Sequence, residues 1–134
     1  TATDTTFPMQ MEEYAQWFAQ LHTMFPRCRN WLMGMRNMVA SSRHLLTALL
    51  YTSTDGEHYS LLRAPIFDIN GVVDPSGVGD AFMAGLLHAI YAFPGQPQLQ
   101  LDYSLAASAL KNTINGDFNI STEDEILDLL KQYK

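Results

Sequence analysis

The segment Val72–Tyr91, VVDPSGVGDAFMAGLLHAIY, constrains the fold of this chain more than any other. Asp74 and Pro75 end an extended run, because proline fixes its own φ and biases the preceding residue towards β. Gly77 and Gly79 then permit backbone angles and close approaches that a Cβ would hinder. Apolar residues follow at helical spacing. The segment therefore predicts a strand, a glycine-rich turn and a helix.

The start of this predicted helix is suited to bind an anion. A helix N-terminus exposes unpaired N–H groups and the positive end of the helix dipole. Such an end can hold a phosphate or a developing oxyanion. Asp80 falls in the first turn, where its carboxylate could take the proton of an attacking hydroxyl group. The alternative is that Asp80 only complements the dipole, and the spacing leaves both interpretations open.

The residues DPSGVGDAFMAGLL resemble the C-terminal signature of the ribokinase/phosphofructokinase-B family of sugar kinases, which reads approximately D-T-x-G-A-G-D-x-F-x-x-G. The residues in register are Asp74, Gly77, Gly79, Asp80, Phe82 and Gly85. Pro75 stands where Thr is usual and has no N–H, whereas Val78 replaces Ala and keeps its amide. The resemblance implies that Asp80 is the catalytic base and that Gly77, Val78 and Gly79 form the anion hole.

A second segment, AASALKNTINGDFNISTEDEILDLL from Ala106, is similar to the end of 2-keto-3-deoxygluconate kinases, which carry a pattern like A-L-K-x-T-I-x-G-D-x-N. The matching residues are Lys111, Thr113, Ile114, Gly116, Asp117 and Asn119. The resemblance implies that Asp117 faces the sugar acid, and we expect Lys111 to lie near the nucleotide. The alternative is that NGD is an ordinary turn between two helices.

A third segment, NWLMGMRNMVASSRHLLTALLYT, resembles a strand and loop of these kinases that often reads T-L-R-x-S-x-S. Arg36, Ser41 and Tyr51 are the matching positions. The loop lies near the nucleotide in the family, which makes Arg36 a candidate contact for the triphosphate. A solvated surface arginine is the alternative.

These observations predict an α/β fold, the C-terminal half of a ribokinase-like three-layer α/β/α sheet. We expect an amphipathic helix between Pro8 and Pro26, strands over 31–35, 45–52, 58–63 and 66–69, and helices over 79–92, 102–113 and 122–131. The chain begins with Thr1 and is about half as long as such a kinase. We therefore expect residues 1–134 to be one partial domain that lacks the N-terminal sugar-binding half and the lid.

Composition narrows the function classes. The net charge is −6, from 8 basic and 14 acidic residues, which disfavours nucleic acid as a partner. The single cysteine, Cys28, cannot form an intrachain disulfide, so we expect a reducing, cytoplasmic location. No apolar run predicts a membrane span. The sequence contains no G-x-S-x-G elbow, and its histidines lack metal-ligand spacing, so we expect neither a hydrolase nor a protein metal site. The histidines are His22, His44, His58 and His88.

The resemblance implies an ATP- and Mg²⁺-dependent kinase that phosphorylates a sugar or sugar acid, with Asp80 as general base. The alternative is a non-catalytic nucleotide-binding or interaction module left by truncation of such a kinase. Without the sugar-binding half we expect the isolated chain to be inactive. An apolar face left open by that half predicts self-association, because large apolar patches tend to be buried. The sequence does not select among sugars.

Overall fold

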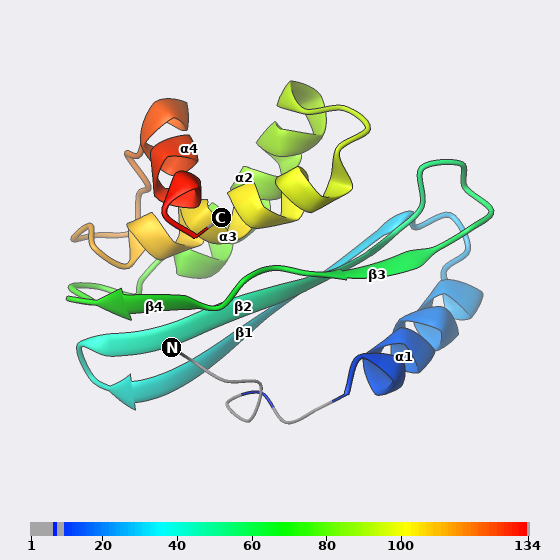
Figure 1. Ribbon diagram of the computed structural model, residues 1–134, viewed down its shortest axis with the longest axis horizontal. Coiled ribbons are helices and arrows are strands. Elements are labelled where there is room, and N and C mark those ends of the chain that lie inside the picture. Colours follow the sequence, from blue (N-terminus) through cyan, green and yellow to red (C-terminus); the bar gives the residue numbers. More distant parts are fainter. Residues whose placement is uncertain (1–6, 8–9, 134) are drawn as a thin grey trace.

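The protein folds into three layers, with a four-stranded sheet between one helix and a group of three helices (Figure 1). The structure is a computed structural model that describes Phe7 and residues 10–133, so the expected helix boundary at Pro8 lies outside the described residues. The helices are α1 (Met11–Met24), α2 (Val78–Ala92), α3 (Pro97–Lys111) and α4 (Glu123–Lys131). The strands are β1 (Asn30–Ala40), β2 (Arg43–Thr52), β3 (Ser60–Arg63) and β4 (Phe67–Asn70).

Strand β2 lies at the centre of the sheet, and the pairs it forms are all antiparallel. On one edge it pairs with β1 over nearly its whole length, from Asn30 opposite Thr52 to Ala40 opposite Arg43. On the other edge β3 covers its second half and β4 its first half. The N–H of Ala64 donates to the carbonyl of Ala48 (2.9 Å), so β3 and β4 behave as one interrupted strand.

The larger core lies between the sheet and helices α2, α3 and α4. Alternate residues of β2 point into it, because successive side chains of a strand face opposite sides. Helix α3 crosses this face and is buried along most of its length. At Gly85 of α2 an added Cβ would lie 3.0 Å from the Cβ of Ala107, so this glycine permits the close packing of α2 on α3. The fully or nearly buried members include Leu46, Ala48, Leu50, Phe67, Leu101, Leu105 and Ala106.

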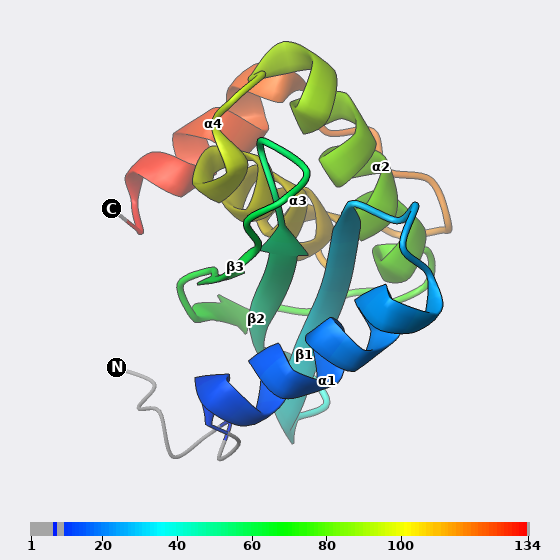
Figure 2. The same ribbon diagram turned by 90° about the vertical axis from the view of Figure 1, so that its right-hand side faces the viewer.

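The opposite face of the sheet is covered by α1, the one described helix on this side, with a small core of Tyr14, Phe18 and Leu49 (Figure 2). The side chains of Met33, Met35 and Tyr51 pack around it. The three-layer α/β fold predicted from the sequence is therefore confirmed.

Several expected boundaries differ from the structure, and the largest differences are at the end of β1 and the start of α3. Strand β1 runs to Ala40 rather than Met35, because β2 offers it partners along the whole hairpin. Helix α3 begins at Pro97, five residues before the expected start. Proline is favoured in a first helical turn, because its fixed φ is already helical and the N–H that it lacks would have no partner there. Helix α3 ends at Lys111 rather than Thr113.

The start of α4 follows the local sequence. The N–H of Thr122 donates to Oε2 of Glu125 (2.7 Å), and the N–H of Glu125 donates to Oγ1 of Thr122 (3.3 Å), which is a reciprocal capping box. Within the described ranges, the helices are all too short or too polar to cross a membrane.

Candidate functional site

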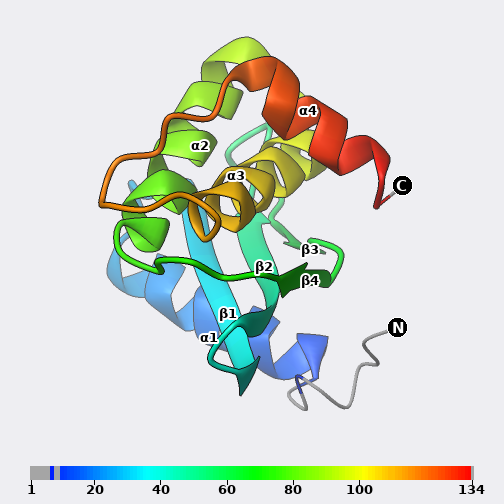
Figure 3. The ribbon, with the colours of Figure 1, turned by 90° about the vertical axis from the view of Figure 1, so that its left-hand side faces the viewer.

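The loop between β4 and α2 is held from two sides (Figure 3). The N–H groups of Gly71 and Val72 donate to the carbonyl of Ser42 in the β1–β2 turn (2.8 and 2.9 Å). The N–H groups of Val73 and Asp74 donate to the carbonyl of Asn112, just after α3 (2.8 and 3.2 Å). Four consecutive amides thus fix the path of the chain into α2.

Asp74 joins the two segments that resemble sugar kinases. One carboxylate oxygen accepts the N–H of Ser76, and the other accepts the N–H of Gly116 (both 2.9 Å). These hydrogen bonds stabilise the charged form and lower the pKa of Asp74 to about 2, with the larger effect from Ser76 and a smaller one from Gly116. The nearby positive charge of Lys111 adds to this shift. The carboxylate therefore clamps the turn before α2 to the loop after α3.

Lys111 reinforces this clamp. Its side chain is fully buried, and its ammonium group donates to the carbonyls of Ile114 (2.9 Å) and Asp74 (3.3 Å). A buried ammonium group needs such partners, because an unpaired charge in the interior is costly. The structure thus places Lys111 behind the loop, and its contact with a nucleotide stays a prediction.

Gly77 is the residue at which the turn becomes a helix. It is the N-cap of α2 with φ of 73°, a left-handed conformation that glycine adopts without steric cost. An added Cβ would overlap the carbonyl oxygen of Asp117, so the two loops touch through their backbones. The side chain of Asp117 itself is exposed on the loop after α3.

The first amides of α2 make few hydrogen bonds within the described part of the chain. The N–H of Val78 makes only a long bond to Pro75 (3.4 Å), and the regular helical pattern starts with Ala81 donating to Gly77 (2.9 Å). The amides of Gly79 and Asp80 find no acceptor in the described part of the chain. They are the unpaired donors that a helix start leaves for an anion.

Arg36 lines the same pocket as Val78 and Gly79 at the start of α2. Its partner across β1 and β2 is Leu46, which puts both on the sheet face that carries α2. A pocket of about 190 Å³ is lined by Arg36 together with Val78, Gly79 and Phe82. The rest of the lining comes from Gly34, Met35, Leu46, Thr47, Leu105 and Ser108. The fold therefore brings Arg36 of β1, which is exposed, to the start of α2.

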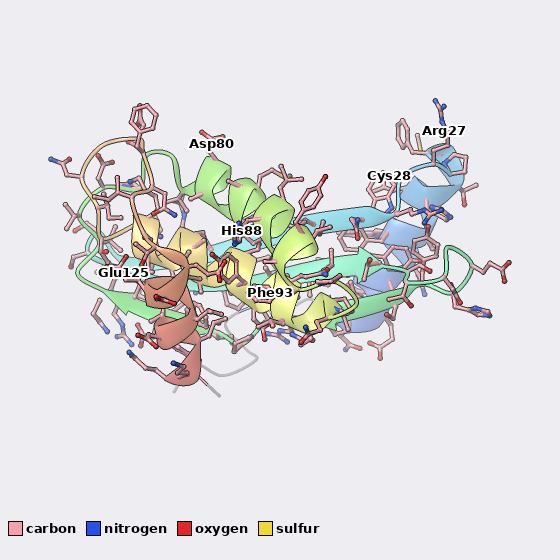
Figure 4. All side chains as sticks on the ribbon, turned by 90° about the horizontal axis from the view of Figure 1, so that it is seen from above. Arg27, Cys28, Asp80, His88, Phe93 and Glu125 are labelled. Atoms are coloured by element: carbon pink, nitrogen blue, oxygen red, sulfur yellow. The ribbon has the colours of Figure 1, made fainter. Side chains whose placement is uncertain are left out.

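Asp80 projects into solvent from the first turn of α2 (Figure 4). It is free to meet a ligand that rests on the helix start. Among residues 10–133, however, no three side chains of the His, Cys, Asp and Glu types gather into a metal-binding group.

The residues that sequence reasoning missed are Ser42, His44 and Asn112. Ser42 and Asn112 act through backbone carbonyls, which any residue type carries, so their identity gave no signal. His44 is buried under the loop next to Asn112. The sequence could have placed His44 on the sheet face of Leu46, because the two residues are two positions apart in one strand and side chains of a strand alternate between faces.

Comparisons with known proteins agree with the fold and the motifs. No family model matches the chain. A 2-dehydro-3-deoxygalactonokinase from Haloferax volcanii is 38% identical over 68 residues, which are 50% of this chain and 20% of the relative. The chain thus spans well under half of the relatives it matches.

Two solved structures share the fold. A PfkB family carbohydrate kinase from Listeria grayi is 25% identical, with a TM-score of 0.78 over 98% of this chain and 40% of that one. A 2-dehydro-3-deoxygluconokinase from Thermotoga maritima is 23% identical, with a TM-score of 0.78 over 91% of this chain and 35% of that one. The resemblance seen in the sequence is confirmed: this chain is similar, in sequence motif and in fold, to part of the PfkB-type carbohydrate kinases.

Proposed function

We propose that this chain is the nucleotide-handling part of a kinase that transfers the γ-phosphoryl group of ATP to a hydroxyl group of a sugar or sugar acid. The observation that carries the proposal is the pocket in which Arg36 meets the first amides of α2, directly before the exposed Asp80. The similarity to sugar kinases supports the same activity.

The residues present fit a nucleoside triphosphate. Within the described residues the amides of Gly79 and Asp80 have no acceptor, and Arg36 offers a planar, permanently charged fork that suits phosphate oxygens. No described group of side chains forms a metal cage, so Mg²⁺ would enter with the phosphates and keep much of its water, as it commonly does in kinases. ATP with Mg²⁺ supplies the transferable phosphoryl group.

Asp80 would act as the general base. Its carboxylate accepts the proton of the attacking hydroxyl, while the amides of the helix start and Arg36 hold the charge that builds on the transferred group. Positioning and electrostatics account for most of the rate in phosphoryl transfer, because little covalent chemistry is left for the protein. The Asp74 clamp and the Gly77 turn keep the helix start in place for this task.

Asp117 would contact the sugar. Its backbone touches Gly77, so its exposed side chain lies on the loop beside the proposed reaction site. A carboxylate can accept hydrogen bonds from sugar hydroxyls. Lys111 would serve the nucleotide site through the loop that it holds. A sugar acid of the 2-keto-3-deoxy type is the proposed substrate, because the names of the similar proteins point to that class.

The proposal includes the remaining part of the enzyme. The chain corresponds to 40% or less of the solved kinases, so the sugar-binding half and the lid would come from the rest of a longer, cytoplasmic protein. The alternative function is a nucleotide-binding or interaction module without catalysis. It needs the helix start and Arg36 but not Asp80.

The experiment that separates the two is Asp80→Asn in the full-length protein that carries this segment. We expect turnover to fall about 10²–10⁴-fold, the usual effect of removing a general base, while ATP affinity stays nearly unchanged. Asparagine keeps the shape of the side chain but cannot accept the hydroxyl proton. Steady-state kinetics and nucleotide titration on the same preparation give both numbers.

Asp124→Asn is the matched control, since Asp124 also lies in a first helical turn, that of α4. It should cost only the dipole contribution of about 0.3–1 kcal/mol in stability and leave turnover intact. If Asp80→Asn behaves like Asp124→Asn, Asp80 is a dipole-stabilising residue and the catalytic role is wrong.

A further inference from the structure

The two edges of the sheet differ in how they are protected. One edge consists of the four-residue strands β3 and β4, with Pro65 between them and the charged residues Arg63 and Asp68 within them. Short strands, proline and charges keep a sheet edge from pairing with another strand. The other edge, β1, has eleven residues without proline, with Arg36 as its one charge and with a bulge only near its end. Among the described strands β1 pairs with β2 alone, so its outer side is a long edge open to a further strand.

Apolar side chains of α2 border this open edge. An added Cβ on Gly34 of β1 would lie 3.2 Å from the ring of Phe82, and Gly85 packs on α3. Successive residues of a helix are turned by about 100°, which puts Met83 and Leu87 on the side of α2 away from α3. These two side chains are 49% and 55% exposed. Helix α2 therefore turns an apolar flank towards the space beside β1, and Figures 2 and 3 show its first turns lying partly beyond that strand.

Helix α1 presents a similar flank on the other face of the sheet. The ring of His22 lies against that of Tyr59 (4.3 Å between centroids), which directs this side of α1 towards the β3 edge. Trp17 lies about 140° round the helix from His22 and is 51% exposed, with Leu21 next to it. Exposed apolar side chains that gather in one region mark an interaction site. The open edge thus lies between apolar flanks in both helical layers.

The pocket between β1 and the start of α2 has an apolar part that an anion does not use. Its lining includes Leu46, Phe82 and Leu105 besides Arg36. Phosphate oxygens are bound by a guanidinium group and by amides, whereas apolar walls are stabilised by contact with apolar atoms. An apolar side chain from a strand beside β1 would fill this part and leave Arg36 for the anion.

A second copy of this chain does not fit along the open edge. Neighbouring strands lie about 4.7–4.9 Å apart, whereas packed helices need about 8–10 Å between their axes. Because α2 lies over β1 and partly beyond it, a copy paired along β1 would bring its own α2 into the same space. The edge therefore fits a strand that carries no helix on the side of α2. Such a strand is buried on both faces, so we expect a nearly continuous run of Val, Ile or Leu.

We propose that the open edge of β1 is the docking surface for one apolar β-strand from the remaining part of a longer kinase, which passes beneath α2 and extends the sheet. The inference rests on the proposed function, because the chain corresponds to 40% or less of the solved kinases and the strand is assigned to the rest. Backbone hydrogen bonds to β1 hold the strand, and its alternating side chains fill the apolar part of the pocket and the space beside Trp17. The added strand thereby completes the wall of the anion site.

Amide hydrogen exchange in the 134-residue chain and in the full-length protein that carries it tests the docking surface. In the chain alone, the amides of β1 that point away from β2 should exchange quickly. In the full-length protein they should exchange on the order of 100-fold more slowly, because they gain acceptors. The outward amides of β3 and β4 are the internal control and should change little. Equal exchange of β1 in both proteins would overturn the inference, and so would dimers of the chain that protect β1.

Met83→Glu tests the apolar flank. In the 134-residue chain the new carboxylate meets solvent, so Tm should stay within about 2 °C of the native value. In the full-length protein it should lower Tm by roughly 4 °C or more, because the charge is buried against the added strand. Ile120→Glu is the matched control, since Ile120 is 76% exposed on the loop after α3 and should tolerate the charge in both proteins. An equal effect of Met83→Glu in the two proteins would contradict the docking surface.

Asp80→Asn separates this inference from the proposed function. Protection of β1 in a full-length protein whose Asp80→Asn variant turns over normally would uphold the docking surface and refute the catalytic role. Loss of turnover in Asp80→Asn without protection of β1 would uphold the catalytic role and overturn the docking surface.

Discussion

The two faces of the sheet differ in depth and in content. The face under α2, α3 and α4 carries a core of fifteen buried apolar residues, and among its buried polar residues His44, Ser108, Lys111 and Asn112 lie towards the loop end. The face under α1 carries a small cluster of Tyr14, Phe18 and Leu49, extended by stacked rings such as Phe18 on Tyr51 (5.7 Å between centroids). The face with the larger core is also the face on which the candidate site lies.

This difference has a physical reason. A helix start can present free amides to a ligand only if the rest of the helix is held firmly, and α2 is held by close packing on α3. Buried polar groups can then serve the loop, because the surrounding core keeps their partners at fixed distances. On the thinner face the buried polar side chain of Thr47 donates to the carbonyl of Ala64 (2.9 Å) and not to the loop before α2. Stability and function should therefore respond differently to changes on the two sides.

The largest expected effect comes from Leu50→Ala compared with Leu49→Ala. Both residues are fully buried and adjacent in β2, but Leu50 faces the larger core and Leu49 faces α1. Leucine-to-alanine changes in cores cost about 2–5 kcal/mol, and the cost depends on how far the site can collapse. We expect Leu50→Ala near the upper end and Leu49→Ala near the lower end, because the single helix α1 can settle into the cavity.

Urea unfolding of the two variants measures the difference in the free energy of unfolding. An equal loss of unfolding free energy in the two variants, or a larger loss in Leu49→Ala, would contradict the view that the α1 face is the less rigid one. Faster proteolysis within α1 in Leu49→Ala but not in Leu50→Ala would support it.

A second, smaller effect is expected at the two glycines of the loop. Gly77→Ala must hold a left-handed φ and place a Cβ against the carbonyl of Asp117, which together should cost about 2–4 kcal/mol. Gly79→Ala meets nothing within 4 Å and lies inside α2, so it should stabilise by up to about 1 kcal/mol. Thermal unfolding of both variants provides the measurement, and a harmless Gly77→Ala would mean that the two loops are not pressed together.

The smallest effect concerns acid stability. The pKa of Asp74 is lowered from its ordinary value of 3.8 to about 2 in the folded protein. Its contribution is therefore present above about pH 4 and is lost as the pH falls towards 2, since the unfolded state then binds the extra proton. The difference in Tm between the native protein and Asp74→Asn should shrink over that range.

Asp117→Asn is the control for this measurement, because it removes an exposed carboxylate in the loop that Asp74 clamps. It should change Tm little. A gap between native protein and Asp74→Asn that stays constant down to pH 2 would contradict the role of the carboxylate as the clamp between the two loops.

Much of the fold could be predicted because its signals are local. The amphipathic spacing of α1, the turn at Asp55 and Gly56, and the capping box of α4 each depend on residues within one or two turns of chain. The glycine-rich segment predicted the loop and the start of α2 to within a residue. The end of β1 could not be predicted, because its last residues are strand only by pairing with β2.

The candidate site divides in the same way. The sequence by itself determined that a glycine-rich turn with Asp80 opens a helix, since turn angles and first-turn charge are set by neighbouring residues. Only the tertiary structure decided that Arg36 shares a pocket with Val78 and Gly79, that Lys111 is buried behind the loop, and that His44 lies beside Asn112. These contacts join segments that are many residues apart, and which of them meet is settled by how the sheet and α3 pack rather than by any local preference.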